Sequence, residues 1–143
     1  MRATTTLVVD DNASFRQRVK EMFADEPDLV VIGEAADGWE AIRKARELRP
    51  ALVIMDLRMP GINGLDATRE LKRQIPETRV LILGQYDLEE YRKAAAASSA
   101  SGYVIKRSLI SAFLPAIREI IGDENNADAL RRQTELGISL STP

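Results

Sequence analysis

Five short aliphatic runs recur along the chain, and segments with helical spacing separate them. The runs are rich in Val, Ile and Leu and are Leu7–Val9, Leu29–Ile32, Leu52–Met55, Val80–Leu83 and Tyr103–Ile105. Continuous rather than alternating apolar runs are typical of parallel strands that are covered on both faces. The repeated β-α order therefore predicts an α/β fold, a doubly wound five-stranded parallel sheet with helices on both faces.

The first two intervening segments illustrate the helical pattern. The first places Phe15 on an apolar stripe and Arg16 on the opposite, polar side. The second begins at Asp37, with an acidic capping-box partner three residues later, and ends before Pro50. This second helix is expected to bury Trp39, Ile42, Ala45 and Leu48.

The remaining helices are expected at about 65–75, at about 88–97 and after the fifth run. Pro115 predicts a late or bent start of the last helix, because proline inside a helix removes an amide and clashes with the preceding turn. With Ser111 as N-cap, that proline would lie at the edge of the first turn. Gly122 is expected to end the helix.

The composition changes after that glycine, which sets the predicted domain organisation. One domain is expected over residues 1–122, followed by a linker or C-terminal tail over 123–143. Within the tail, residues 127–136 could form a short helix with a thin apolar face, and the last residues are expected to fray.

The composition also excludes several kinds of chemistry. The 143 residues include neither cysteine nor histidine, which excludes disulfides, thiol nucleophiles, Ser-His-Asp triads and histidine–metal sites. With 20 basic and 22 acidic side chains the net charge is −2, which argues against a protein that mainly coats nucleic acid or membranes. No export signal or membrane helix is recognisable, so a cytoplasmic protein is expected.

Charged residues follow three of the five predicted strands. Asp10 and Asp11 follow the first, Asp56 follows the third and Lys106 follows the fifth. In a sheet of order 2-1-3-4-5, the first and third strands flank the point where the strand order reverses, and ligands bind there outside the carboxyl ends of the strands. Three carboxylates and an ammonium group are therefore expected at one crevice.

This combination favours a magnesium site that supports phosphoryl transfer. Clustered carboxylates repel one another, and a hard divalent cation with oxygen ligands offsets the repulsion. Asp10 and Asp11 are adjacent and suited to holding the metal, whereas Asp56 stands alone after its strand and is the better nucleophile. Lys106 would pair with the remaining charge.

Each of these residues alone also has a simpler interpretation. An acidic or amide side chain after a strand is most often a helix N-cap, which either Asp11 or Asn12 could be. A single lysine such as Lys106 is more often a solvated loop residue. The hypothesis depends on position, because unrelated surface charges would lie at both ends of the sheet.

Several segments together resemble the receiver domain of bacterial two-component response regulators. They are Leu7–Asp11, Val53–Gly61, Asn63-Gly64 and Gly102–Lys106. The resemblance covers about residues 5–121 and implies the flavodoxin-like receiver fold. Details at 37–41 and 116–120 are similar to the class that usually carries a LuxR-type DNA-binding domain. No such domain is expected in these 143 residues, so DNA would be contacted only through an output domain outside them.

The resemblance implies a role for each residue of the crevice. A sensor histidine kinase or phosphotransfer protein would supply a phosphoryl group to Asp56, and Lys106 would pair with that group. The ligands of the required Mg²⁺ would be Asp10, Asp11, Asp56 and the backbone carbonyl of Arg58. The protein would be a phospho-accepting signalling domain in transcription regulation, not a turnover enzyme.

The resemblance also implies an output surface. The family uses the face formed by the fourth helix, the fifth strand and the fifth helix, where Tyr103 matches the aromatic residue that switches. A homodimer would use that face or the face of the first and fifth helices.

The sequence departs from the family at two places. Family receivers carry Ser or Thr after the fourth strand, whose hydroxyl bonds a phosphoryl oxygen, but here the residue is Gly84. Asp56 is still expected to accept phosphate, with a weakened signal to Tyr103. The second departure is Ser98-Ser99-Ala100, where a glycine is usual and a non-glycine residue is expected to strain the turn.

Three other functions are alternatives to the phospho-accepting receiver. An atypical receiver that acts as a protein-interaction module without phosphate is favoured by Gly84 and opposed by the intact acidic residues. An aspartate-nucleophile phosphatase would need a second aspartate two residues after Asp56, where Arg58 stands. A flavin-binding protein would need a Ser/Thr/Gly-rich loop after the first strand, where Asp10 and Asp11 would repel phosphate.

Overall fold

The computed structural model describes the backbone of residues 3–135 and the side chains of residues 3–122. Within this part, the strands are β1 (Thr4–Val9), β2 (Leu29–Ala35), β3 (Leu52–Asp56), β4 (Arg79–Gly84) and β5 (Gly102–Ile105). The helices are α1 (Ala13–Phe23), α2 (Gly38–Leu48), α3 (Gly64–Gln74), α4 (Glu89–Ala97) and α5 (Leu109–Glu135), with a 3₁₀ turn over Lys106–Ser108. Every predicted aliphatic run lies in a strand, so the predicted β-α order is confirmed.

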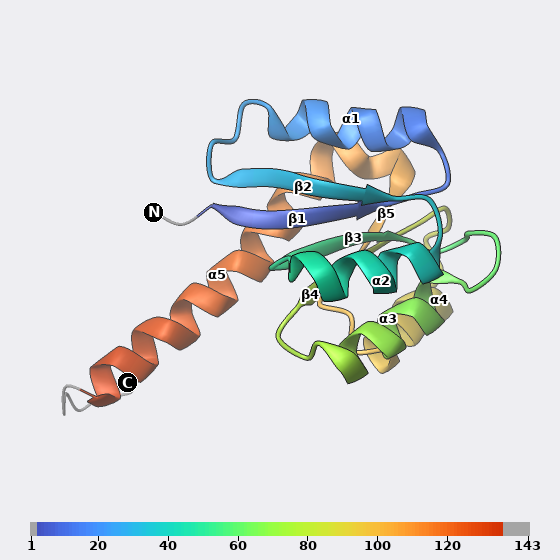
Figure 1. Ribbon diagram of the computed structural model, residues 1–143. Coiled ribbons are helices and arrows are strands. Elements are labelled where there is room, and N and C mark those ends of the chain that lie inside the picture. The colour runs from blue at the N-terminus through green and yellow to red at the C-terminus, as the bar shows by residue number, and fades with distance from the viewer. Residues whose placement is uncertain (1–2, 136–143) are drawn as a thin grey trace.

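The strands form one parallel sheet of order β2-β1-β3-β4-β5, as the sequence predicted (Figure 1). β1 and β3 are neighbours in the middle of the sheet, and Val9 lies opposite Met55. The chain leaves β1 towards β2 and leaves β3 towards β4, so the strand order reverses between these two strands. A crevice is expected at their carboxyl ends.

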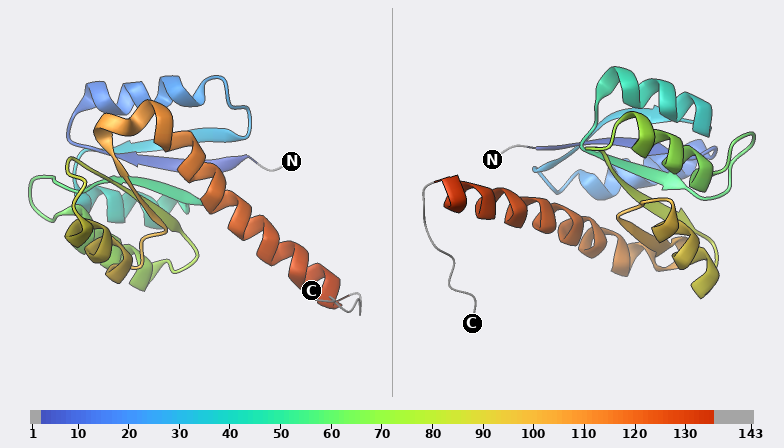
Figure 2. Two further views of the ribbon diagram at one scale, coloured as in Figure 1. Left: turned by 180° about the vertical axis from the view of Figure 1, so that it is seen from behind. Right: turned by 90° about the horizontal axis from the view of Figure 1, so that it is seen from below.

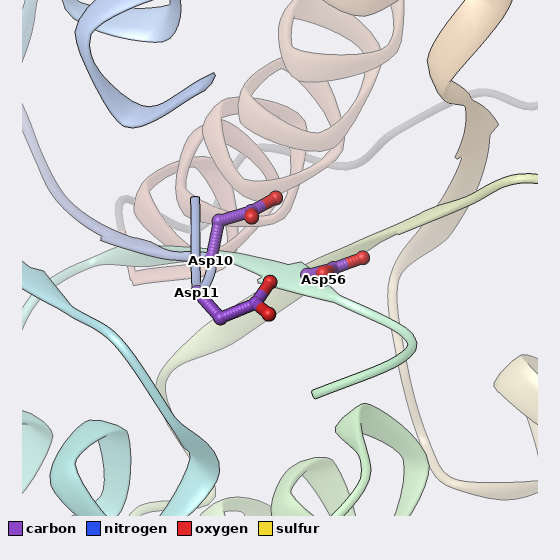
Figure 3. A group of neighbouring side chains, drawn as sticks. All are labelled: Asp10, Asp11 and Asp56. Carbon is purple, nitrogen blue, oxygen red and sulfur yellow. The ribbon is translucent and has the colours of Figure 1, made fainter. Parts of the chain in front are cut away.

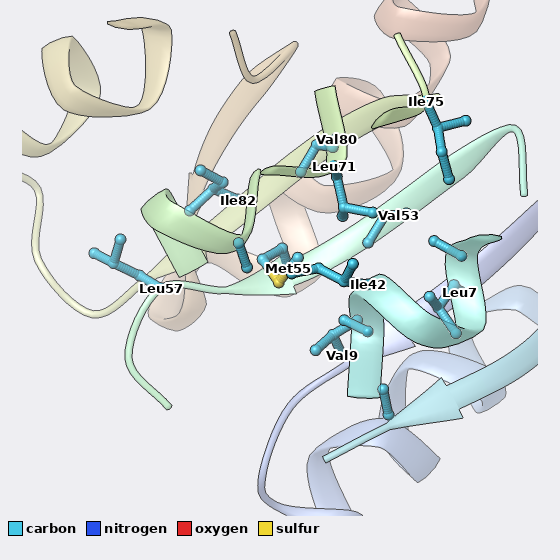
Figure 4. Packing of buried hydrophobic residues seen from close by; sticks show 14 of the residues in the cluster. Leu7, Val9, Ile42, Val53, Met55, Leu57, Leu71, Ile75, Val80 and Ile82 are labelled. Carbon is cyan, nitrogen blue, oxygen red and sulfur yellow. The ribbon is translucent and has the colours of Figure 1, made fainter. Parts of the chain in front are cut away.

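Helices cover both faces of the sheet. α2, α3 and α4 lie on one face, and α1 and α5 lie on the other (Figure 1). Side chains alternate along each strand, so Leu7 and Val9 belong to the core under α2, α3 and α4, while Val8 belongs to the core under α1 and α5. Figure 4 shows the core under α2, α3 and α4, which includes Leu7, Val9, Ile42, Val53, Met55, Leu71 and Ile82.

The prediction that Trp39 and Leu48 belong to the core is wrong. Their exposed fractions are 63% and 40%, whereas Ile42 and Ala45 are buried as expected. The buried stripe of α2 also includes Gly38 and Ala41, and this stripe is centred between the two exposed residues. Successive side chains of a helix are rotated by about 100°, so Trp39 and Leu48 lie on the two sides of the buried stripe and outside it.

For the last helix, the late start with Ser111 as N-cap and the end at Gly122 are also wrong. α5 begins at Leu109 after the 3₁₀ turn, and the Ser111 hydroxyl donates to the Ser108 carbonyl instead of capping the helix. Pro115 lies inside the helix, and the helix continues through Gly122 to Glu135 (Figure 2). One glycine inside a helix costs about 1 kcal/mol relative to alanine, so it does not by itself stop a helix.

The predicted tail thus begins as a continuation of α5. The short helix predicted over 127–136 is part of α5 as far as Glu135, and residues 136–143 lie outside the described residues. The boundary between residues 122 and 123 stays a prediction, with a helix now crossing it. None of the helices between residues 3 and 135 combines the length and the apolar character that a membrane span needs.

Candidate functional site

The three aspartates converge at the carboxyl ends of β1 and β3. Asp10 and Asp11 follow β1 directly, and Asp56 is the last residue of β3. Each offers a carboxylate oxygen, and these oxygens lie within 4.8 Å of one another (Figure 3). Asp10 and Asp56 are buried and Asp11 is exposed, so the cluster has a buried floor and an open side. The predicted convergence is confirmed.

Lys106 completes the cluster from the end of β5. Its Nζ lies 2.7 Å from Oδ2 of Asp10 and 3.2 Å from Oδ1 of Asp56. The same ammonium group lies 4.3 Å from the centre of the Phe15 ring on α1, a cation–π contact. Lys106 is therefore a constrained member of the site and not a solvated loop residue.

The charges of the site act on one another. Burial and the nearby charge of Asp10 raise the pKa of Asp56 to about 6, although Lys106 and the backbone N–H of Arg58 partly oppose this. Burial acts to lower the pKa of Lys106, but its hydrogen bond to Asp10 and the charges of both carboxylates outweigh that effect and raise it. A further cation would stabilise the ionised form of Asp56.

Backbone contacts hold the turn that carries Asp10 and Asp11. The Asn12 N–H donates to Oδ1 of Asp10 over 2.9 Å, and the Asn12 side chain accepts from the Phe15 N–H as the N-cap of α1. Asn12 therefore does the capping, and the simpler interpretation of Asp11 as the N-cap is wrong.

An arginine on α1 fixes the same turn from the other side. Nη1 of Arg16 donates to the backbone carbonyl of Asp10 over 2.6 Å, and its Nε donates to Glu34 on β2 over 3.0 Å. Lys20 also pairs with Glu34, at 3.1 Å. The guanidinium group thus links the Asp10 peptide to the edge strand.

The start of α3 lies against the backbone of Asp56. A Cβ on Gly64 would lie 2.2 Å from the Asp56 carbonyl oxygen, so only glycine fits there without a shift of the backbone. The Gly64 N–H donates to the Leu57 carbonyl over 2.8 Å. This close approach holds the loop that carries Arg58 beside the acidic cluster.

Tyr103 fills the space beside Gly84. A Cβ on residue 84 would lie 1.9 Å from the Tyr103 hydroxyl oxygen and 2.5 Å from its Cζ. The hydroxyl donates to the Tyr86 carbonyl over 2.8 Å, and the Arg92 guanidinium lies 5.3 Å from the ring centre. Burial raises the pKa of Tyr103, and the charge of Arg92 partly opposes this.

The turn before β5 has the strain that the sequence predicted. Ser99 has a φ of 69°, in the left-handed region that favours glycine. Its N–H donates to the Ala96 carbonyl at the end of α4. The departure from the family at Ser98-Ser99-Ala100 is thus accommodated by a strained serine.

Sequence reasoning missed three contributors to the site. The helical pattern predicts Phe15 on the apolar stripe and Arg16 on the solvent side, yet Phe15 contacts Lys106 and Arg16 contacts Asp10. Tyr86, an exposed loop residue, anchors Tyr103 through its carbonyl. The one available signal was the position of Phe15 and Arg16 in the first turn after the acidic pair.

Comparison with known proteins decides the family. The model of the response regulator receiver domain matches residues 6–118, which is most of the chain. The chain is a response regulator receiver domain. It belongs to a family of signalling domains, and the strand order and the acidic pocket of this receiver agree with that assignment.

Curated relatives of this receiver are regulators of transcription or two-component responses. It is 33% identical over 114 residues to the transcriptional regulatory protein DegU of Brevibacillus brevis, covering 80% of this chain and 48% of that protein. It is 37% identical over 118 residues to the response regulator GacA of Pseudomonas viridiflava, covering 82% and 55%. The chain thus spans about half the length of these relatives.

Solved structures agree with the sequence relatives. A two-component response regulator of the LuxR family from Aurantimonas sp. SI85-9A1 matches with a TM-score of 0.81 and 33% identity, over 85% of this chain and 86% of that chain. The response regulator domain of Thermotoga maritima CheB matches with a TM-score of 0.76 and 32% identity, over 82% and 96%. The resemblance to receivers of the LuxR class is therefore supported by both sequence and structure.

Proposed function

We propose that this receiver accepts a phosphoryl group on Asp56 from a sensor histidine kinase or phosphotransfer protein, in a reaction that requires Mg²⁺. The observation that carries the proposal is the approach of three carboxylates to within 4.8 Å with the Lys106 ammonium beside two of them. In the transfer, an oxygen–phosphorus bond forms at Asp56 and the nitrogen–phosphorus bond of the donor histidine breaks. Asp56 must be ionised to attack.

The donor set fits magnesium. All the candidate ligand atoms are oxygens, which suit a hard cation, and the exposed Asp11 leaves one side of the cluster open to water and phosphoryl oxygens. In the proposal, Asp10, Asp11, Asp56 and the backbone carbonyl of Arg58 hold the ion, which would neutralise charge on the phosphoryl oxygens. Lys106, already between Asp10 and Asp56, would move its pairing to a phosphoryl oxygen.

The biological setting is part of the proposal. The relatives include regulators of transcription, and the chain spans only about half of their length. We propose that α5 continues towards an output domain that would contact DNA, and that the protein acts in the cytoplasm. The surface of α4, β5 and α5 would carry the output, and a homodimer would use this surface or that of α1 and α5.

Intact mass spectrometry tests the phosphoryl acceptor. After incubation with acetyl phosphate and Mg²⁺, the wild type is expected to gain about 80 Da, the mass of one phosphoryl group. Asp56→Ala should gain nothing, whereas Asp25→Ala, which changes an exposed aspartate of the α1–β2 turn, should react like the wild type. An equal adduct on Asp56→Ala, or none on the wild type, contradicts the proposal.

A second candidate function is a protein-interaction module that signals without phosphate. The packing of Tyr103 against Gly84 favours it, because residue 84 has no side chain that could contact a phosphoryl group. Titration with Mg²⁺ and beryllofluoride separates the two candidates. Thermal stabilisation that depends on Asp56 supports the phospho-accepting receiver, and its absence supports the interaction module.

A further inference from the structure

Gly84 and the ring of Tyr103 compete for one space. The distance of 1.9 Å between a Cβ on residue 84 and the Tyr103 hydroxyl oxygen is far below any real contact. The nearest obstacles are all atoms of the Tyr103 side chain, so a side chain on residue 84 and the observed ring position exclude each other. Glycine at 84 is therefore the condition for the ring to lie where it does.

Two contacts hold the ring in this position. The Tyr103 hydroxyl donates to the Tyr86 carbonyl over 2.8 Å, and Arg92 lies over the ring. Arg92 is itself held by Asp87, with 3.1 Å between Nη2 and the carboxylate. The ring is thus anchored to the β4–α4 loop through its hydroxyl and to α4 through its face.

The β4–α4 loop, which carries Tyr86, is itself held by contacts to Tyr91 and Arg58. The Tyr86 ring stacks on the Tyr91 ring, with 6.1 Å between the ring centres. The Arg58 guanidinium lies 5.5 Å from the centre of the Tyr86 ring and donates to the Tyr91 hydroxyl. These contacts keep the Tyr86 carbonyl where the Tyr103 hydroxyl needs it.

We infer that Gly84 locks Tyr103 against the end of β4 whether or not Asp56 carries a phosphoryl group. Residue 84 follows Leu83, the partner of Asp56 in the sheet register, and lies against the Tyr103 side chain, so it links the strand end beside Asp56 to Tyr103. Without a side chain it has no hydroxyl that could bind a phosphoryl oxygen and no Cβ that could push the ring. The surface that Tyr103 forms with Arg92 and Asp87 therefore has one permanent shape.

This inference rests on the proposed function and narrows it, because output through the surface of α4, β5 and α5 would then not depend on a movement of Tyr103. Fluorine NMR of protein labelled with 3-fluorotyrosine tests the two separately. The chain has three tyrosines, and Tyr→Phe variants at positions 86, 91 and 103 assign the resonances. The solvent isotope shift of the Tyr103 resonance reports whether the ring is covered. The bound beryllofluoride has fluorine resonances of its own, which report independently on the phosphoryl site.

The wild type should show one covered Tyr103 resonance that does not move when Mg²⁺ and beryllofluoride bind. Gly84→Ala should move this resonance to a solvent-exposed position in the free protein. Gly122→Ala is the matched control, because a Cβ there meets no atom within 4 Å, and it should leave the resonance unchanged.

Two results would overturn the lock. One is a wild-type Tyr103 resonance that is exposed or that shifts when beryllofluoride binds, and the other is a Gly84→Ala resonance at the wild-type position. If no bound beryllofluoride appears, the proposed function fails, and the comparison of the free proteins still decides this inference.

Discussion

Nζ of Lys106 lies 3.2 Å from Oδ1 of Asp56, so the proposed phosphoryl acceptor already has a cationic partner. The same ammonium lies 2.7 Å from Asp10, and it balances one of the three carboxylate charges of the pocket. The charge that remains matches a divalent cation. We therefore expect the stability of the protein to depend on pH and on magnesium.

The first prediction concerns the pKa of Asp56. Because this pKa is raised from 3.8 to about 6, the folded state binds the proton more tightly than the unfolded state. The resulting stabilisation is complete below about pH 4 and is lost as the pH rises through about 6. Near pH 7.5 and without metal, Asp56→Asn should therefore be more stable than the wild type by up to about 3 kcal/mol.

Urea unfolding at several pH values measures this difference. The advantage of Asp56→Asn should vanish as the pH falls below about 4, because the wild-type carboxyl then becomes protonated in both states. A difference that is the same at both ends of the pH range would show that the substitution acts through packing and not through the charge.

The second prediction concerns Asp11, the exposed member of the trio. Without metal, Asp11→Asn should change the free energy of unfolding by no more than about 0.5 kcal/mol, because the side chain is not buried. It should weaken Mg²⁺ binding about tenfold, or roughly 1.4 kcal/mol. Asp25→Asn removes another exposed carboxylate and should bind Mg²⁺ like the wild type. Full thermal stabilisation of Asp11→Asn by Mg²⁺ would remove Asp11 from the ligand set.

The third prediction concerns Arg16, which donates to the carbonyl of Asp10 over 2.6 Å. Arg16→Met keeps much of the aliphatic side chain but frees the Asp10–Asp11 peptide, so Mg²⁺ binding should weaken about tenfold, as when other outer contacts of metal sites are lost. Arg18→Met, at an exposed position of the same helix, is the matched control. Isothermal titration at a temperature where both variants are folded checks this. Equal Mg²⁺ affinities would show that Arg16 has no positioning role.

The fourth prediction concerns the strained turn before β5. Ser99 has a φ of 69°, so Ser99→Gly should relieve a steric cost and raise the free energy of unfolding by about 0.5–1 kcal/mol. Ser101→Gly, close by but without a positive φ, should lower it by a similar amount, because glycine only adds freedom to the unfolded chain there. Chemical denaturation measures both, and a loss of stability in Ser99→Gly would contradict the strain.

Local pattern was sufficient for the sheet and the acidic pocket. The aliphatic runs are short and continuous, and parallel strands place the residues that follow them at one edge, so Asp10, Asp56 and Lys106 had to meet once the strand order was right. Periodicity was less informative at the margins of helices. Trp39 and Leu48 belong to an apolar pattern yet lie beside the buried stripe, because a small rotation of a helix moves its flanking residues out of the core.

Contacts between residues far apart in the sequence could not be predicted from local pattern. No rule of spacing could show that the ring of Tyr103 occupies the room that Gly84 leaves, or that Arg16 reaches the carbonyl of Asp10. The same holds for α5, which continues through Gly122 although glycine commonly ends a helix. The sequence pattern determines which residues follow the strands and so lie at the end of the sheet, because strands and helices have regular, hydrogen-bonded backbone repeats. The contacts between those groups depend on rotamers and close packing, which arise only when distant segments meet.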